Sequence, residues 1–242
     1  MGKIETINFN KNEDLAEYLA NFVIKIGERS IANQSRFNLV LTGGNSILPV
    51  YSKLSGYSVH SFWENTTFFW GDERCVPPED HQSNYDNAWK SLLSKVSISP
   101  HQIHRIPGEL GNSRAANIYN QLIKEEVDAA KQRNFSNLFD LTLLSIGEDG
   151  HIASLFPGQG YLDQPGLYSI PVEAHYDNRP SQRVSLTSYA LRQSRFLMLI
   201  ASGEKKLAAI SKVFDQTLSA EVVPAKRILE NEGILYILSV IE

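Results

Sequence analysis

The chain contains very little cysteine and no strong excess of charge. Cys75 is the only cysteine among 242 residues, so no intramolecular disulfide can form and no thiolate cluster is available to bind zinc. The formal net charge is −4, which supplies no broad basic field of the kind that attracts nucleic acid. We therefore expect a protein of a reducing compartment, the cytoplasm by default, with no nucleic-acid partner.

Long hydrophobic runs are also absent. No apolar stretch approaches the ~20 residues that span a membrane, and residues 1–10 lack the apolar core of a signal peptide. Linkers rich in proline, glycine or serine are missing too, as are internal repeats. Since 42% of the residues are hydrophobic, the chain can bury one large core. We expect no membrane partner and a single domain over residues 1–242.

Segments with helical spacing alternate with short apolar segments typical of strands. Apolar residues three and four positions apart predict helices over 12–29, 47–54, 84–96, 114–133, 205–214 and 225–230. Apolar or alternating runs predict strands over 37–41, 67–70, 141–146, 183–187, 196–200 and 234–240. Strands that alternate with helices need crossover connections, which build a mostly parallel sheet covered on both faces. The sequence thus predicts a doubly wound, Rossmann-like α/β fold.

The stretch from Leu141 to Gly158 carries the strongest functional signal. Its apolar residues suit a buried strand, and the strand ends abruptly in a turn that contains Gly147, Gly150 and His151. Ligands of open α/β sheets bind at the carboxyl ends of the strands. An imidazole at that edge is a candidate for acid or base chemistry, because its unperturbed pKa lies close to neutral pH.

Three further polar loops follow predicted strands and are expected at the same edge. The four loops together are 42–46, 71–74, 147–151 and 202–206. A glycine turn that opens a helix presents backbone amides and the positive end of the helix dipole, which suit a phosphate. Gly43, Gly44, Asn45 and Ser46 fit this role. Since the loop has neither the lysine of a P-loop nor the third glycine of a dinucleotide fingerprint, no nucleotide cofactor is expected.

Several of these motifs together resemble the 6-phosphogluconolactonase family. The residues that carry the resemblance are Gly71-Asp-Glu-Arg-Cys-Val76, Ser83-Asn-Tyr85, Gly147-Glu-Asp-Gly-His-Ile-Ala-Ser-Leu-Phe-Pro-Gly158, Arg183-Val-Ser-Leu-Thr187 and Gly203-Glu-Lys-Lys206. The related glucosamine-6-phosphate deaminases share the Asp-Gly-His core but usually continue with Ala-Phe-Asn-Glu. This chain continues with Ala153-Ser-Leu-Phe-Pro157, which favours the lactonase.

The resemblance implies hydrolysis of 6-phospho-D-glucono-1,5-lactone, a small phosphosugar lactone, without a metal or an organic cofactor. His151 is then expected to take a proton from the attacking water, and Asp149 to orient the imidazole or stabilise its charged form. The same resemblance implies that the substrate phosphate is bound by cationic side chains and by the glycine loop. The matching cations are Arg74, Arg183 and Lys206, and Asp72 is expected in the same binding site, where it could fix Arg74.

Two departures from the family pattern stand out. The first loop is Thr42-Gly-Gly-Asn-Ser-Ile47, where the family usually has Ser-Gly-Gly-Ser-Thr-Pro, and Ser145 stands where the family often has glycine. Two alternatives stay open at this point. One is an aminosugar-phosphate deaminase or isomerase, and the other is a non-catalytic sugar-phosphate sensor that uses the same pocket. The sequence makes no prediction of oligomeric state.

Overall fold

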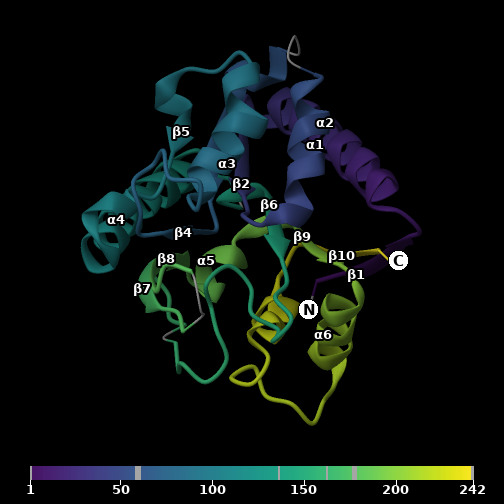
Figure 1. Ribbon diagram of the computed structural model, residues 1–242. Helices are drawn as coiled ribbons and strands as arrows, with labels where there is room; N and C mark the ends of the chain where they lie inside the picture. Colours follow the sequence, from purple (N-terminus) through teal and green to yellow (C-terminus); the bar gives the residue numbers. More distant parts are fainter. Residues whose placement is uncertain (1, 58–60, 136, 162, 176–178, 241–242) are drawn as a thin grey trace.

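A seven-stranded parallel sheet forms the centre of the molecule (Figure 1). The computed structural model describes residues 2–57, 61–135, 137–161, 163–175 and 179–240. In spatial order the strands of this sheet are β1 (Ile4–Phe9), β10 (Ile234–Val240), β9 (Ser194–Ser202), β6 (Phe139–Ser145), β2 (Phe37–Leu41), β3 (Thr66–Trp70) and β5 (Ile103–His104). All six neighbouring pairs are parallel.

Helices cover both faces of this sheet, as the alternating pattern predicted. The α-helices are α1 (Asn12–Gln34), α2 (Leu48–Ser55), α3 (Asn84–Ser91), α4 (Asn112–Gln132), α5 (Ser188–Leu191) and α6 (Glu204–Phe214). Figure 1 shows α1 and α2 on one side of the parallel strands and α6 on the other. Right-handed crossovers account for this division, because the chain moves in opposite directions across the sheet through α1 and through α6. The prediction of a doubly wound α/β fold is therefore confirmed.

A smaller antiparallel sheet lies beside the parallel one. Its strands are β4 (Asp72–Arg74), β8 (Gln182–Leu186) and β7 (Ser169–Glu173), and α4 packs against β7 and β8. The predicted strand over 183–187 thus exists as β8, but it belongs to this second sheet. Its pairing with β4 sets Arg74 directly opposite Arg183. The small sheet therefore holds Arg74 and Arg183 next to each other on adjacent strands.

Buried apolar strands and amphipathic helices build the core. Every residue of β2 is buried, and β6 is buried over its first six residues, as expected for strands covered on both faces. Among the helices, α1 buries one side with Leu15, Leu19 and Val23. No helix among the described residues is long and apolar enough to cross a membrane.

Several elements differ from the sequence-based prediction. Strands β1, β4, β5 and β7 were not predicted, and their short or partly exposed sequences carry a weak periodic signal. The predicted helix over 84–96 is α3 followed by a separate 3-10 turn at Leu93–Lys95, and the segment around 225–230 is a 3-10 helix, Pro224–Glu230. Helix α1 continues five residues beyond the predicted end at Arg29, to Gln34.

Candidate active site

A cleft opens where four neighbouring strands of the parallel sheet end. Strands β9, β6, β2 and β3 lie next to one another, and their carboxyl ends carry the four polar loops singled out in the sequence. The cleft has a volume of about 1210 Å³. All ten predicted site residues line it, namely Gly43, Gly44, Asn45, Ser46, Asp72, Arg74, Asp149, His151, Arg183 and Lys206. The expectation that these loops share one edge of the sheet agrees with their placement.

His151 is fixed within the turn that follows β6. The backbone N–H of Gly147 donates to the carbonyl of His151 at 2.8 Å, and Gly150 adopts a φ of 87°, which favours glycine. A Cβ atom on Gly147 would lie 2.1 Å from Cε1 and Nδ1 of His151. The imidazole therefore packs directly against Gly147, and only a glycine there leaves room for it.

Asp149 contacts the imidazole from within the same turn. Its Oδ1 lies 2.5 Å from Nδ1 of His151 and also accepts the backbone N–H of His151 at 3.1 Å. Because a carboxylate accepts hydrogen bonds, the contact places a hydrogen on Nδ1. The ring of Phe156 lies against the imidazole, with centroids 4.8 Å apart. Asp149 and Phe156 together fix the orientation of the imidazole.

The two acidic residues of the 71–74 loop are buried and fully engaged by the protein. The Asp72 carboxylate accepts from Asn84 Nδ2 at 3.1 Å and from Ser154 Oγ at 2.6 Å, so it joins the start of α3 to the His151 loop. Glu73 accepts four hydrogen bonds, three from the backbone and one from a hydroxyl, whose donors are Arg74 N, Asn84 N, Tyr85 N and Ser83 Oγ. Burial nevertheless raises the pKa of Glu73 to about 7.

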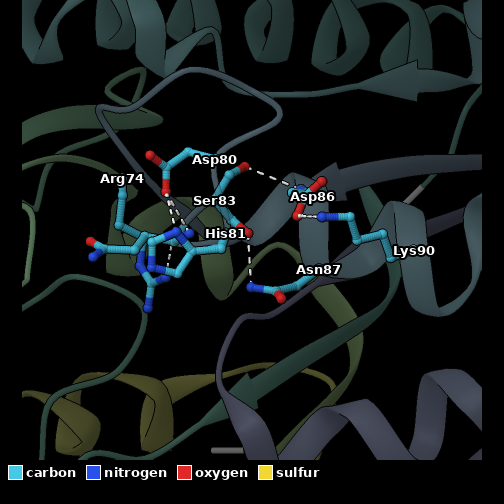
Figure 2. A network of polar contacts seen from close by, with 8 residues as sticks. Arg74, Asp80, His81, Ser83, Asp86, Asn87 and Lys90 are labelled. Atoms are coloured by element: carbon cyan, nitrogen blue, oxygen red, sulfur yellow. Dashed lines mark hydrogen bonds and ion pairs between the residues drawn. The ribbon is translucent and has the colours of Figure 1, made fainter.

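Arg74 and Arg183 come from paired strands of the small sheet and both line the cleft. The guanidinium of Arg74 donates to the backbone carbonyl of Gln82 at 2.5 Å, within the loop before α3 (Figure 2). Arg183 is buried, its Nε donates to the carbonyl of Pro180 at 3.2 Å, and its guanidinium lies 5.5 Å from the ring centroid of Phe156. Phe156 thus packs against both His151 and Arg183, which brings a cation close to the candidate base.

The glycine loop after β2 is fitted closely to its surroundings. A Cβ atom on Gly43 would lie 1.9 Å from Oδ1 of Asn84, so this glycine allows α3 to approach. Gly44 has a φ of 94° and precedes the 3-10 turn Asn45–Ile47 and helix α2, with no side chain capping that turn. The amides at this end are therefore available to a ligand.

Lys206 approaches the cleft from the first turn of α6. Its Nζ lies 3.0 Å from Ser145 Oγ and 3.4 Å from Ser46 Oγ. Burial lowers the pKa of Lys206, and the nearby Arg179 lowers it further, while Glu148 opposes the shift. A partly desolvated ammonium beside hydroxyl groups is suited to binding an anion.

Several further residues line the cleft that were not predicted as site residues, among them Asn84, Ser145 and Arg179. Asn84 lies in the Ser83-Asn-Tyr85 motif, but its contacts with Asp72 and Gly43 depend on tertiary packing. Arg179 stands four residues before Arg183, just ahead of β8, so two cations close in sequence line the cleft. Within the described part of the chain, no group of three or more His, Cys, Asp or Glu side chains is placed to hold a metal ion.

Comparison with known proteins places the chain in one family. Residues 10–237 match the family model described as glucosamine-6-phosphate isomerases/6-phosphogluconolactonase. A probable chloroplastic 6-phosphogluconolactonase 3 from Oryza sativa subsp. indica is 33% identical over 234 residues, 94% of this chain and 71% of the relative. The 6-phosphogluconolactonase of Treponema pallidum is 31% identical over 200 residues, 82% of this chain and 80% of the relative.

A solved structure gives the same result. The crystal structure of 6-phosphogluconolactonase from Thermotoga maritima superposes with a TM-score of 0.82 at 25% sequence identity, covering 98% of this chain and all of that one. The two proteins therefore share the same fold over nearly their whole length. The chain therefore belongs to the glucosamine-6-phosphate isomerase/6-phosphogluconolactonase family.

Proposed function

We propose that the protein hydrolyses 6-phospho-D-glucono-1,5-lactone to 6-phospho-D-gluconate. The observation that carries the proposal is the pair of His151 and Asp149, which stands in one cleft with three cationic side chains suited to a phosphate. The names of the related proteins support the same substrate. A lactone carbonyl is already electrophilic, so a water molecule, a base and a correctly held substrate are sufficient for hydrolysis.

The proposed chemistry begins at Nε2 of His151. This nitrogen takes a proton from a water molecule as the water oxygen attacks the lactone carbonyl carbon, which forms a tetrahedral intermediate. The intermediate then collapses, the bond between that carbon and the ring oxygen breaks, and the imidazolium returns its proton to the ring oxygen. The product acid loses its proton to solvent. Asp149 stabilises the imidazolium and keeps the ring oriented throughout.

The cations hold the far end of the substrate. A phosphate monoester carries about −1.5 to −2 charges at neutral pH, and Arg74, Arg183 and Lys206 supply positive charge around the cleft. A fixed phosphate places the lactone carbon at a set distance from His151, so binding energy becomes alignment of the reacting atoms. Asp72 would contribute by bracing the loop that carries Arg74, because the protein itself engages both of its carboxylate oxygens.

A coupled assay tests the proposal. The lactone is generated in place with glucose-6-phosphate dehydrogenase, and its disappearance is compared with the spontaneous rate. Release of ammonia from glucosamine 6-phosphate is measured in parallel with the same protein. We expect acceleration of the first reaction only. Ammonia release would support the deaminase, and acceleration of neither reaction would support a sugar-phosphate sensor.

A further inference from the structure

Three polar groups from three different elements meet in the cleft. Ser145 Oγ, at the end of β6, lies 3.1 Å from Ser46 Oγ and 3.0 Å from Lys206 Nζ. The third side of the triangle, from Lys206 Nζ to Ser46 Oγ, measures 3.4 Å. Each of the three side chains thus contacts both others, and we call this group the Lys206 cluster.

The Lys206 cluster has hydrogen-bond donors that are not used by the contacts within it. An ammonium carries three N–H hydrogens and each hydroxyl carries one O–H hydrogen. The contacts of the triangle use one hydrogen each, so an ammonium hydrogen and a hydroxyl hydrogen are left over. Among the described residues, no carboxylate lies within hydrogen-bonding distance of Lys206 Nζ. A ligand that supplies only acceptor oxygens would therefore satisfy this cluster.

The charged groups around the cluster leave Lys206 available to an anion. Arg179 acts on Lys206 as a like charge and lines the same cleft. Glu148, the acidic side chain that acts on Lys206, is exposed and forms an ion pair with the neighbouring Lys205 at 3.2 Å. Helix α6 begins beside the cluster at Glu204, after Gly203 with a φ of 92°, and no side chain caps it. The uncapped helix end and the unused donors thus lie in the same part of the cleft.

We propose that the Ser145 hydroxyl is a direct ligand of the substrate phosphate, in a phosphate-binding site that it shares with Lys206 and Ser46. The inference rests on the proposed function, because it deepens the phosphate-binding half of that site. Ser145 can donate its hydroxyl hydrogen to one phosphate oxygen while it continues to accept from Lys206. The same hydroxyl holds the Lys206 ammonium in place when no phosphate is bound, so the site is partly organised before the substrate binds.

The test compares Ser145→Ala with Ser145→Thr, which restores a hydroxyl at the same position. Ser211→Ala is the matched control, because Ser211 is an exposed serine on α6 that bonds only the carbonyl of Leu207. A hydrogen bond to a charged group contributes enough to change affinity about tenfold or more. We expect Ser145→Ala to raise KM for the phosphorylated lactone about tenfold with little change in kcat, and Ser145→Thr to recover part of the loss.

Two ligands separate the phosphate from the rest of the substrate. Inorganic phosphate should inhibit the wild type competitively, and its inhibition constant should rise about tenfold in Ser145→Ala. Hydrolysis of the unphosphorylated 1,5-gluconolactone should be the same in both proteins. An unchanged inhibition constant for phosphate, or an equal loss with the unphosphorylated lactone, would overturn the inference.

The design keeps this inference distinct from the proposed function. Binding of inorganic phosphate is also measured by calorimetry on the wild type, Ser145→Ala and Ser145→Thr, with thermal melts to verify folding. If the wild type hydrolyses the lactone and phosphate binds Ser145→Ala as tightly as it binds the wild type, the proposed function stands and the inference fails. If no hydrolysis is found but phosphate binding depends on the hydroxyl, the inference stands and the lactonase proposal fails.

Discussion

The buried pair Asp72 and Glu73 and the Lys206 cluster use their hydrogen-bonding groups in opposite ways. At Asp72 and Glu73 the protein supplies the hydrogen-bond donors that the carboxylates need, and both residues are buried. At the Lys206 cluster the donors exceed the acceptors that the described residues supply. The difference separates two kinds of polar residue in one site. A side chain whose partners are all internal holds the site together, whereas one with unspent donors is prepared for a ligand.

His151 belongs to a third kind, because the role proposed for it is chemical and Asp149 fixes its orientation through Nδ1. Replacement by alanine removes the base but leaves the cations in place. We expect His151→Ala to lower kcat by about 10²- to 10⁴-fold with little change in KM. Steady-state kinetics with the phosphorylated lactone measure both parameters. Turnover close to that of the wild type would exclude the assigned role.

Asp149→Asn tests how much of the contribution of His151 to kcat depends on the orientation of its imidazole ring. The amide keeps the size of the carboxylate but removes its charge and can turn its NH₂ group toward Nδ1. We expect a smaller fall in kcat than in His151→Ala, again without a matching rise in KM. A rise in KM alone would place Asp149 in substrate binding instead.

Glu73 provides the strongest test of the structural kind. Glu73→Ala leaves the donors of Arg74, Ser83, Asn84 and Tyr85 without their acceptor. We expect the free energy of unfolding to fall by about 3 kcal/mol, measured by urea denaturation. Glu79→Ala, an exposed residue of the following loop, serves as the control. A loss of activity without a loss of stability would contradict a purely structural role for Glu73.

The pH dependence of stability sharpens the same comparison. Burial raises the pKa of Glu73 from its ordinary value of 4.5 to about 7. A raised pKa means that the folded state binds the proton more tightly, so this contribution to stability is complete below about pH 4.5 and is lost as the pH rises to about 7. Glu73→Gln lacks it. The difference in unfolding free energy between wild type and Glu73→Gln should therefore shift against the wild type across this window.

Gly147 tests how closely the base is fitted. A Cβ atom there would lie 2.1 Å from the His151 ring, so Gly147→Ala must displace the imidazole. A displacement of about 1 Å at a reacting group can lower the rate by about 10²-fold. In Gly71→Ala, at the end of β3, the nearest atom would be Leu144 Cδ2 at 3.5 Å, an ordinary contact. We expect kcat to fall in the first variant much more than in the second.

The parallel sheet could be predicted from the sequence because its central strands are short, apolar and followed by glycine. The apolar runs at 37–41 and 196–200 show this pattern, because glycines follow each of them within three residues. The edge strand β1 and strand β7 of the small antiparallel sheet were missed because alternate residues there face solvent and the segments are short. Their signal depends on pairing with distant strands.

The candidate site residues were predicted from motifs, but their arrangement was not. Nothing local in the sequence places Ser145 beside Lys206, because the two are joined only when β6 and β9 pair. Likewise, Asp72 could be placed in the site from its motif, whereas its bond to Ser154 requires the folded loop. Sequence therefore identified which chemical groups are present, and tertiary structure determined which of them have partners.

The adjacent residues Lys205 and Lys206 give the smallest expected effect and the most direct control. Lys205 is exposed and pairs with the exposed Glu148 at 3.2 Å, whereas Lys206 turns into the cleft against two hydroxyls. An exposed ion pair contributes about 0 to 1 kcal/mol, so Lys205→Ala should change stability and kinetics very little. Lys206→Ala should raise KM for the phosphorylated lactone strongly, because it removes the positive charge of the proposed phosphate-binding site. Equal losses in the two variants, measured by steady-state kinetics at the same ionic strength, would mean that general positive charge near the cleft binds the phosphate rather than the organised cluster.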